Sequence, residues 1–304
     1  MQTIQVEHIS KSYGKTMAPA VDDVSFAVNQ GEVFGLIGPD GAGKTSLFRI
    51  LTTLLLPDQG RASVDGFDIV NDYKKIRNTV GYMPGRFSLY QDLTVQENLH
   101  FFATIFNTTI EKNYHLIKDI YVQIEPFRKR KAGQLSGGMK QKLALCCALI
   151  HQPTVLFLDE PTTGVDPVSR KEFWEMLLRL KEEGITIMVS TPYMDEATKC
   201  DRIALIQHGK LLSIDTPENI SAAFTDHLYA VKSSNMPALL RELSLYEKTK
   251  SSYAFGEFAH LICIDQTTDA QNIKDYLSGK GLVDVAVQLT TPTIEDCFIK
   301  LLST

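Results

Sequence analysis

The chain has 304 residues, with 31 Lys or Arg and 36 Asp or Glu, so its formal net charge at pH 7 is -5. The length favours about two domains. The basic residues are scattered, which disfavours a nucleic-acid groove and a polybasic membrane patch. No apolar run approaches the roughly 20 residues of a membrane-spanning helix, so we expect a chain that stays in the cytosol.

The first sixty residues predict an antiparallel lobe followed by the start of a second sheet. Extended stretches at 3–7 and 24–29 precede a short apolar run at 33–37 that suits a buried strand. Apolar residues then recur at helical spacing from 46 to 56, which predicts a helix.

Between that strand and that helix lies Gly38-Pro-Asp-Gly-Ala-Gly-Lys-Thr45, which fits the phosphate-loop pattern Gly-x-x-x-x-Gly-Lys-[Ser/Thr]. Its glycines let successive N–H groups face a polyphosphate at a helix N-terminus. Lys44 would place a charge at the β and γ phosphates, and the Thr45 hydroxyl would be a Mg²⁺ ligand. The alternative, a glycine-rich turn that only ends a strand, is disfavoured by the flanking elements. We predict Mg-ATP binding by Gly38, Pro39, Asp40, Gly41, Ala42, Gly43, Lys44, Thr45 and Ser46.

The pattern becomes helical from about residue 85 to residue 150. A capping box at Thr94-Val-Gln-Glu97 precedes an apolar helical run at 98–106. Further on, Leu135-Ser-Gly-Gly-Met-Lys-Gln141 opens another helix. This places the Ser136 hydroxyl and the amides of Gly137 and Gly138 at a positive helix end, as a second anion site. The alternative is an ordinary Ser-Gly N-cap.

A second apolar strand, at 154–158, ends in two acids, Asp159 and Glu160. The carboxyl end of a strand is where open α/β sheets bind ligands. Asp159 would hold Mg²⁺ in its outer shell, and Glu160 could deprotonate the water that attacks the γ-phosphate. Without Lys44, solvated turn acids would be an equal alternative. Further strands at 185–189, 203–206 and 211–214, with a helix at 169–183, predict an α/β fold with a parallel sheet covered on both faces.

The strand and helix pattern restarts after Pro217. It reads as strand (228–232), helix (236–246), strands (252–255 and 260–264), helix (270–279), strand (282–288) and a last helix from Thr293. This order favours a small ferredoxin-like α+β domain. We therefore predict two domains, 1–220 and 221–304. The five cysteines are odd in number and lack metal-ligand spacing, which favours buried reduced thiols.

The motifs occur in the order and spacing of an ABC transporter nucleotide-binding subunit, which residues 1–220 resemble. The resemblance implies a P-loop ATPase that dimerises head to tail, so that the signature 135–139 of one subunit closes on ATP held by the other. Two anion sites then make physical sense. It also implies that Tyr13 stacks on adenine, that Asp166 lies in a dimer-contact loop, and that 85–150 docks on a separate membrane subunit. By sequence alone, Tyr13 could equally be a packed aromatic and Asp166 an Asp-Pro turn.

Two positions depart from the family pattern. Gly85 stands where the family has Gln, and Pro192 stands where it has the His that contacts the γ-phosphate. One interpretation is that both are turn residues for which neighbours compensate. The other is a site that binds ATP but hydrolyses it slowly, for which a heterodimer with a more active partner ATPase is favoured over an efficient homodimer.

The sequence Thr291-Pro-Thr-Ile-Glu-Asp-Cys-Phe-Ile-Lys-Leu-Leu302 resembles the ending of daunorubicin-resistance-type exporter ATPases. This implies an ATPase on the inner face of the cell membrane that exports drugs, antibiotics or lipids. A non-transport ABC protein is the first alternative, but two modules in one chain or a long inserted coiled coil would mark it, and this sequence has neither. The second alternative is a regulatory subunit that binds ATP without useful turnover.

Overall fold

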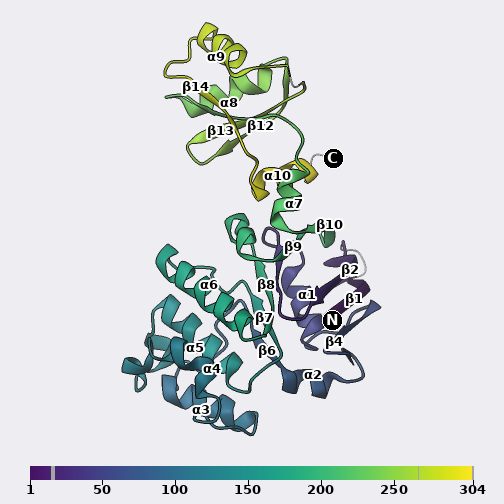
Figure 1. Ribbon diagram of the computed structural model, residues 1–304, viewed down its shortest axis with the longest axis vertical. Coiled ribbons are helices and arrows are strands. Elements are labelled where there is room, and N and C mark those ends of the chain that lie inside the picture. The colour runs from purple at the N-terminus through teal and green to yellow at the C-terminus, as the bar shows by residue number, and fades with distance from the viewer. Residues whose placement is uncertain (15–17, 266, 303–304) are drawn as a thin grey trace. The chain divides into compact units, whose positions relative to one another are not determined.

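The computed structural model describes residues 1–14, 18–265 and 267–302. The chain divides into two compact units, Met1–Pro217 and Glu218–Thr304, which we call the N-terminal unit and the C-terminal unit. Figure 1 labels their helices and strands, and each unit is described by itself.

The N-terminal unit is built on a six-stranded sheet of order β10-β9-β3-β8-β7-β6. The five strands from β9 to β6 are parallel, as predicted, and β10 pairs antiparallel with β9 through a turn at His208 and Gly209. Every residue of β3, β7 and β8 is buried, because helices and a second sheet cover both faces. The strands are β3 (Val33–Ile37), β6 (Val80–Met83), β7 (Val155–Asp159), β8 (Thr186–Thr191), β9 (Arg202–Gln207) and β10 (Lys210–Asp215).

An antiparallel sheet of order β2-β1-β4-β5 forms the predicted lobe. Its inward side chains, such as Ile4 and Val24, share one core with helix α1 and the central sheet. In that core the Phe48 ring of α1 meets the Phe157 ring of β7 edge to face, with 5.9 Å between centroids. The elements are β1 (Gln2–Lys11), β2 (Val21–Asn29), α1 (Lys44–Leu51), β4 (Gln59–Val64) and β5 (Phe67–Asp68).

Helix α1 is shorter than the helix predicted for 46–56. Thr53 has a positive φ of 63°, and the amides of Leu54 and Leu55 both donate to the Arg49 carbonyl. These bonds close the helix one turn early, as left-handed C-terminal motifs do. Apolar residues continue at helical spacing beyond Leu51, so the prediction placed the end of this helix too late.

Helices α3, α4 and α5 lie together on one side of the N-terminal unit (Figure 1). The capping box predicted at Thr94 and Glu97 is present. The buried Asn98 side chain donates to the carbonyls of Tyr90 and Leu93, which holds the loop before α3. The helices of this unit are α2 (Tyr73–Thr79), α3 (Val95–Ile105), α4 (Tyr114–Tyr121), α5 (Gly137–Leu149) and α6 (Pro167–Glu182), with short 3-10 turns at Glu125–Phe127, Ala132–Gln134 and Met194–Lys199.

The C-terminal unit has a four-stranded antiparallel sheet of order β12-β13-β11-β14. Leu239, Leu243, Ile273 and Leu277 of two helices pack on one face of the sheet. Strand β14 begins four residues later than predicted, because the Leu282 amide still donates to Leu277 and closes the preceding helix. The elements, from a short linking helix onward, are α7 (Pro217–Ala222), β11 (Leu228–Lys232), α8 (Met236–Leu245), β12 (Thr249–Phe255), β13 (Phe258–Cys263), α9 (Ala270–Gly279), β14 (Ala286–Thr290) and α10 (Ile294–Leu302).

A buried carboxylate, Asp296, fastens α10 to this sheet. Its Oδ1 accepts hydrogen bonds from the Tyr253 hydroxyl at 2.7 Å and from His260 Nδ1 at 2.6 Å. Its Oδ2 accepts from the amide and the hydroxyl of Thr293, both at 2.7 Å. Burial acts to raise the pKa of Asp296, but the hydrogen bonds from Tyr253, Thr293 and His260 outweigh it and hold that pKa below its usual value.

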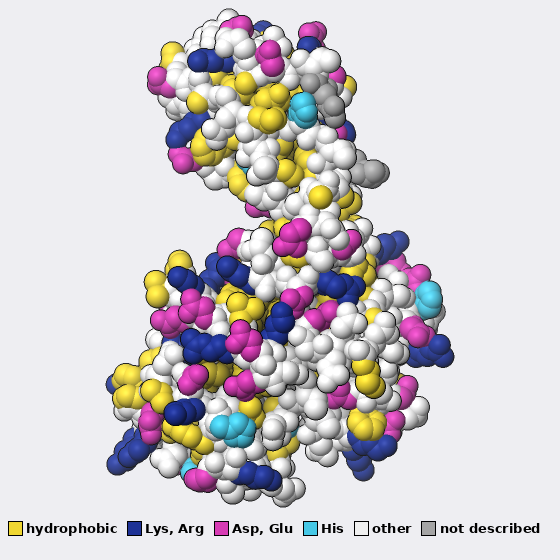
Figure 2. Space-filling view, viewed as in Figure 1, with side chains coloured by type: hydrophobic (Ala, Val, Ile, Leu, Met, Phe, Trp, Pro, Cys, Tyr) yellow, Lys and Arg dark blue, Asp and Glu magenta, His cyan; other side chains and the backbone are white. Residues whose placement is uncertain are grey.

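The surface carries charges of both signs. On the face shown in Figure 2, Lys and Arg side chains alternate with Asp and Glu side chains rather than gather in large patches of one sign. Among the described residues, none of the helices combines the length and the apolar character needed to span a bilayer. The five cysteines are buried and free, as the sequence predicts.

We predict that Asp296→Asn destabilises the C-terminal unit by about 3 kcal/mol, because the amide group would put an N–H donor against two donors that now share one oxygen. Hydrogen exchange of 218–302 followed by mass spectrometry, in rising urea, measures this. Glu295→Gln is the matched control, since it makes the same chemical change at an exposed position of the same helix.

The same carboxylate gives this prediction a pH dependence. The folded-state pKa of Asp296 lies below the unfolded value of about 3.9. The stabilisation by this carboxylate is therefore complete well above the unfolded pKa and is lost as the pH falls through the folded-state pKa. The difference in stability between wild type and Asp296→Asn should therefore shrink in acid. A difference that stayed constant from pH 7 to pH 3 would contradict the assigned role of the charge.

Candidate functional site

The predicted phosphate loop lies between β3 and α1, where only glycine fits at two positions. Gly43 has a φ of 107°, and a Cβ there would lie 2.1 Å from the Ala20 carbonyl oxygen. A Cβ on Gly38 would lie 2.2 Å from the Ile206 carbonyl oxygen. The Gly38 amide donates to the Thr191 carbonyl at 3.2 Å, which ties the start of the loop to the end of β8. Close packing of backbone on backbone therefore fixes the loop.

Lys44 and Glu160, the two predicted catalytic residues, lie in direct contact. Lys44 is 3% exposed, and its Nζ lies 3.0 Å from Glu160 Oε1. The same ammonium donates to the carbonyls of Gly38 at 2.8 Å and Pro39 at 3.0 Å. The lysine therefore folds back over its own loop and meets the end of β7.

The two acids after β7 are held by Ser190, a residue that the sequence analysis did not single out. The Ser190 hydroxyl donates to Asp159 Oδ1 at 2.7 Å. The Glu160 amide donates to the Ser190 hydroxyl at 3.0 Å and to its carbonyl at 3.1 Å. Glu160 adopts a positive φ of 51°, which is uncommon for a residue with a Cβ. Ser190 thus orients both acids.

The oxygen atoms available at this site suit Mg²⁺. Asp159 is buried at the end of β7, and Thr45 is in the first turn of α1, which packs against β7. Mg²⁺ usually takes one or two protein oxygens and completes its shell with water and substrate phosphates. In the described part of the chain no three His, Cys, Asp or Glu form a metal cluster.

Tyr13 leaves most of its side chain open to solvent. It is 58% exposed, and its hydroxyl lies 3.0 Å from the Ser46 hydroxyl in the first turn of α1. The alternative of a packed aromatic is therefore not what the structure has. Of the remaining loop residues, Asp40 and Gly41 are exposed, whereas the Ala42 carbonyl accepts a hydrogen bond from Gly209.

The second predicted anion site is a helix N-terminus with an open approach. Ser136 caps α5 by accepting from the Met139 amide at 3.4 Å, and both Ser136 and Gly137 are exposed. A Cβ on Gly138 would lie 2.9 Å from Ser169 Oγ, so α5 and the start of α6 approach closely. Within the described residues, no hydrogen bond joins this site to the phosphate loop.

The loop that begins α6 contains Asp166, which is the N-cap of that helix. Its Oδ1 accepts from the amides of Val168 and Ser169. These hydrogen bonds, the one from Ser169 first, lower the pKa of this exposed carboxyl. The cap also explains why α6 begins at Pro167, two residues before the predicted start.

The departures from the family pattern lie beside Asp159 in the case of Gly85 and beside the residue bonded to the phosphate loop in the case of Pro192. A Cβ on Gly85 would lie 3.0 Å from the Asp159 carbonyl oxygen, so a larger residue there must displace its neighbours slightly. Pro192 follows Thr191, whose carbonyl accepts from the Gly38 amide. Substitutions at either position would therefore be felt at the acids or at the phosphate loop.

An apolar groove of about 190 Å³ lies between the central sheet and α3 and α5. His151 lines it, stacked on Phe106 at 3.8 Å between ring centroids, with Nε2 donating to the Val80 carbonyl. Burial lowers the pKa of His151, so the imidazole is neutral and Nδ1 is an acceptor. Nδ1 has no partner among the described residues. Leu89, Phe102, Met83 and Cys147 also line the groove.

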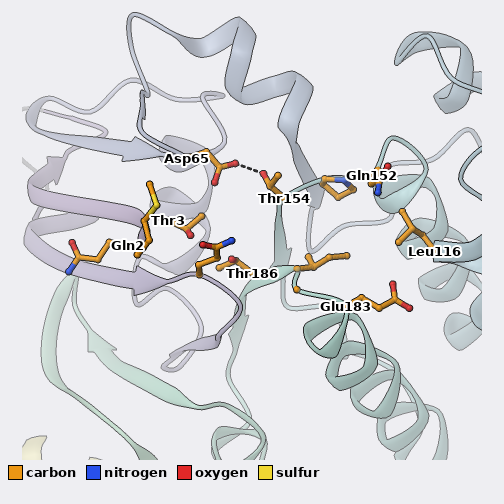
Figure 3. A pocket seen from close by; sticks show the side chains of 13 residues that line it. Gln2, Thr3, Asp65, Leu116, Gln152, Thr154, Glu183 and Thr186 are labelled. Atoms are coloured by element: carbon orange, nitrogen blue, oxygen red, sulfur yellow. Dashed lines mark hydrogen bonds between the residues drawn. The ribbon is translucent and has the colours of Figure 1, made fainter.

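A larger cavity, of about 510 Å³, lies away from the phosphate loop. It is lined by Thr154 and Thr186 at the amino ends of β7 and β8, whereas the loop follows the carboxyl end of β3. Figure 3 shows Asp65 bonded to Thr154 at its rim. Its Gln, Thr and acidic side chains form no cluster with phosphate-binding character.

Comparisons with known proteins agree with this geometry. A family model described as ABC transporter matches residues 21–163. Nod factor export ATP-binding protein I of Burkholderia lata is 38% identical over 307 residues, which cover 96% of this chain and 98% of that protein. The chain belongs to the ABC transporter ATP-binding proteins.

Its relatives include drug-resistance proteins, as the C-terminal motif predicts. The Daunorubicin resistance ATP-binding protein DrrA2 of Streptomyces coeruleorubidus is 31% identical over 306 residues, 98% of this chain and 94% of that protein. The probable multidrug ABC transporter ATP-binding protein YbhF of Escherichia coli is 38% identical over 304 residues, but the chain spans only 52% of its length. The chain thus spans about half of that relative.

Solved structures confirm the cassette fold. A structure described as the ATP binding subunit of an ABC transporter superposes with a TM-score of 0.66 at 27% identity. The match covers 73% of this chain and 93% of that one. The predicted α/β P-loop fold is therefore confirmed.

We predict that Lys44→Ala lowers the affinity for Mg-ATP by roughly ten- to a hundredfold, because it removes a charged contact of about 1.5–3 kcal/mol. Titration calorimetry on the folded variant measures this. Lys11→Ala is the control, since Lys11 bonds Asp58 outside the phosphate loop. Equal affinities of wild type and Lys44→Ala would remove the phosphate-binding role from this loop.

Proposed function

We propose that this chain is the ATP-hydrolysing subunit of an exporter, a peripheral protein on the inner face of the cell membrane that acts on a separate membrane subunit. The observation that carries the proposal is the contact between Lys44 and Glu160 at the mouth of the glycine-rich loop. Lys44 would bind the β and γ phosphates of ATP, and this would release Glu160. A freed Glu160 carboxylate could then accept the proton of the attacking water. Bound Mg²⁺ would neutralise the developing phosphate charge.

The exposed cap at Ser136, Gly137 and Gly138 supports a head-to-tail dimer. Its free amides and helix dipole favour an anion, yet among the described residues they share no hydrogen bond with Lys44 or its loop. ATP bound to a second ATPase subunit could supply the phosphate for the N-terminus of α5. An ATP-binding cassette, MJ0796, described as dimeric and bound to ADP and phosphate, superposes with a TM-score of 0.64 at 25% identity.

The groove beside His151 is our proposed docking site for the membrane subunit. It lies at the junction of the sheet and the predicted helical subdomain at 85–150, and Phe102, Phe106 and Leu89 give it an apolar wall. An apolar segment of the partner with one hydrogen-bond donor would suit the bare Nδ1 of His151. The cargo class that we propose from the family resemblance is drugs, antibiotics or lipids.

We also propose a fold type and a role for the C-terminal unit. We interpret it as a ferredoxin-like accessory domain, an interpretation supported by its strand order and antiparallel pairing. It contains no nucleotide motif, so we expect regulation rather than ATP binding. The regulatory alternative for the whole chain, ATP binding without turnover, is favoured only by Gly85 and Pro192.

We predict that a fragment of residues 1–217 binds Mg-ATP with the affinity of the full chain, because the loop, Glu160 and Asp159 all belong to the N-terminal unit. Calorimetry on the purified fragment tests this, with circular dichroism as the check on folding. A folded fragment that bound no ATP would show that the C-terminal unit contributes to the site.

We predict slow hydrolysis at this chain's own site. Gly85 and Pro192 lack the side chains that would orient Mg²⁺ and contact the γ-phosphate, and losing one such contact commonly costs about 10²–10³ in rate. Steady-state ATPase of the purified chain should therefore rise in a Gly85→Gln/Pro192→His double variant. Gly85→Ala controls for steric strain, because its Cβ meets the Asp159 carbonyl oxygen in the same way.

A substitution at Ser136 tests the proposed head-to-tail dimer. Ser136→Ala in this chain should slow hydrolysis at a partner's site while leaving ATP binding at Lys44 intact. Brisk turnover of the wild-type chain alone, unchanged in the double variant, would show that another group holds the γ-phosphate and would overturn the proposed asymmetry.

A further inference from the structure

Three separate segments of the N-terminal unit meet at one buried carboxylate, that of Glu196. This residue lies in the 3-10 turn Met194–Lys199 and is 3% exposed. Its Oε1 accepts from the hydroxyl of Thr162 at 2.8 Å and from Nε of Arg170 at 3.2 Å. Thr162 belongs to the loop that follows Glu160, and Arg170 belongs to helix α6. Glu196 thus fastens the loop after β7 both to a helix and to the turn after β8.

The guanidinium of Arg170 is held in place by further contacts. It pairs with Asp195 at 3.2 Å, and it stacks on the Tyr193 ring, with 4.2 Å between its carbon and the ring centroid. The Tyr193 amide donates to the Thr191 hydroxyl at 3.1 Å, and the Thr191 carbonyl accepts from the amide of Gly38. A buried charge is costly unless it is paired and hydrogen-bonded, so carboxylate and guanidinium fix each other. Consecutive contacts therefore connect this cluster to the phosphate loop.

Glu160 needs support from its neighbours because its backbone conformation is strained. Its φ is 51°, and a residue with a Cβ keeps such a conformation only where the surrounding structure holds it. On one side, the Glu160 amide donates to the hydroxyl and the carbonyl of Ser190. On the other side, the Thr163 amide donates to the Glu160 carbonyl at 3.2 Å, and the neighbouring Thr162 side chain is buried and bonded to Glu196. Thr162 is therefore the side-chain anchor on this second side.

We propose that Thr162 and Glu196 are positioning residues for ATP hydrolysis, which hold the backbone of Glu160 so that its carboxylate can reach the attacking water. This rests on the proposed role of Glu160 as the base. A displacement of about 1 Å at a reacting group can lower a rate by about 10²-fold, even when the substituted residue lies far from the chemistry. Loss of the bond between Thr162 and Glu196 should therefore lower kcat and leave ATP binding at Lys44 unchanged.

Filling space in the interior is the alternative role for Thr162, and two conservative substitutions separate the roles. Thr162→Val keeps the shape of the side chain but removes the hydroxyl donor. Thr162→Ser keeps the donor but removes a methyl group. A positioning role makes Thr162→Val the more harmful change, because a buried carboxylate loses a hydrogen bond. A packing role makes Thr162→Ser the more harmful change, because it leaves a small void.

We expect the kcat of the full chain, measured by release of radiolabelled phosphate, to fall roughly ten- to a hundredfold in Thr162→Val and much less in Thr162→Ser. The Kd for Mg-ATP from calorimetry should equal that of wild type in both variants, which also verifies that they are folded. Thr198→Val is the control, because it removes an exposed hydroxyl of the same turn that bonds only the Asp195 carbonyl among the described residues. It should leave kcat unchanged.

Hydrogen exchange gives a second readout, which needs no turnover. The amides of Glu160 and Thr163 are both hydrogen-bonded within this loop region. In Thr162→Val, the peptide that contains them should exchange faster than in wild type, as followed by mass spectrometry on the full chain without nucleotide. The peptide that contains Gly38–Thr45 should keep its wild-type exchange rate, because the contacts through Arg170 are intact in this variant.

Three outcomes would overturn the proposal, and they differ from one another. Wild-type kcat in Thr162→Val, or wild-type exchange where turnover is too slow to measure, would remove the positioning role while a Glu160→Gln variant without turnover still supported the base. A larger loss of kcat in Thr162→Ser than in Thr162→Val would assign packing instead. Wild-type turnover in Glu160→Gln would overturn the proposed base itself, and with it any need to position that residue.

Discussion

The ion pair between Lys44 and Glu160 is the interaction on which the functional end of this protein depends. It joins a loop after β3 to the end of β7, two strands separated in the sheet by β8. A buried ammonium must be paired, and here it is held by one carboxylate and two backbone carbonyls. The parallel sheet is what brings these groups together, since it places the carboxyl ends of its strands along one edge. An incoming phosphate would exchange one set of oxygens for another without leaving the charge unpaired.

Buried polar groups divide into two kinds in this chain. Around Asp296 every oxygen is used, by Tyr253, His260 and Thr293, and the result is a rigid joint between helix and sheet. Around Glu196 one oxygen is used, and the other has no partner among the described residues. A fully satisfied network adds stability and specificity, whereas a half-satisfied one is a cost unless something else completes it. Asp296 therefore anchors a helix to a sheet with both oxygens bonded, whereas Glu196 Oε2 is a buried acceptor without a partner among the described residues.

Local chemistry made much of the fold predictable. The phosphate loop, the capping box at Thr94 and the strand that ends in Asp159 all depend on residues close together in the sequence. What could not be predicted depends on long-range pairing. Ser190 is 31 residues from Asp159, and Arg170 is 26 residues from Glu196, so no pattern in the sequence links them. The predicted end of α1 was wrong for a different reason. The hydrogen bonds that end α1 join backbone amides to the Arg49 carbonyl, and backbone groups leave no pattern in the sequence.

The two departures from the family pattern lie next to residues that are joined by hydrogen bonds. Gly85 packs against the backbone of Asp159, and Pro192 follows the residue that bonds the phosphate loop. Ser190, two residues before Pro192, binds the carboxylate of Asp159 and the amide of Glu160. Effects of substitutions add only when the sites share no partners. Gly85 lies against Asp159, and Pro192 comes two residues after the serine that orients both acids, so we expect the effects of Gly85→Gln and Pro192→His on hydrolysis to be coupled rather than additive.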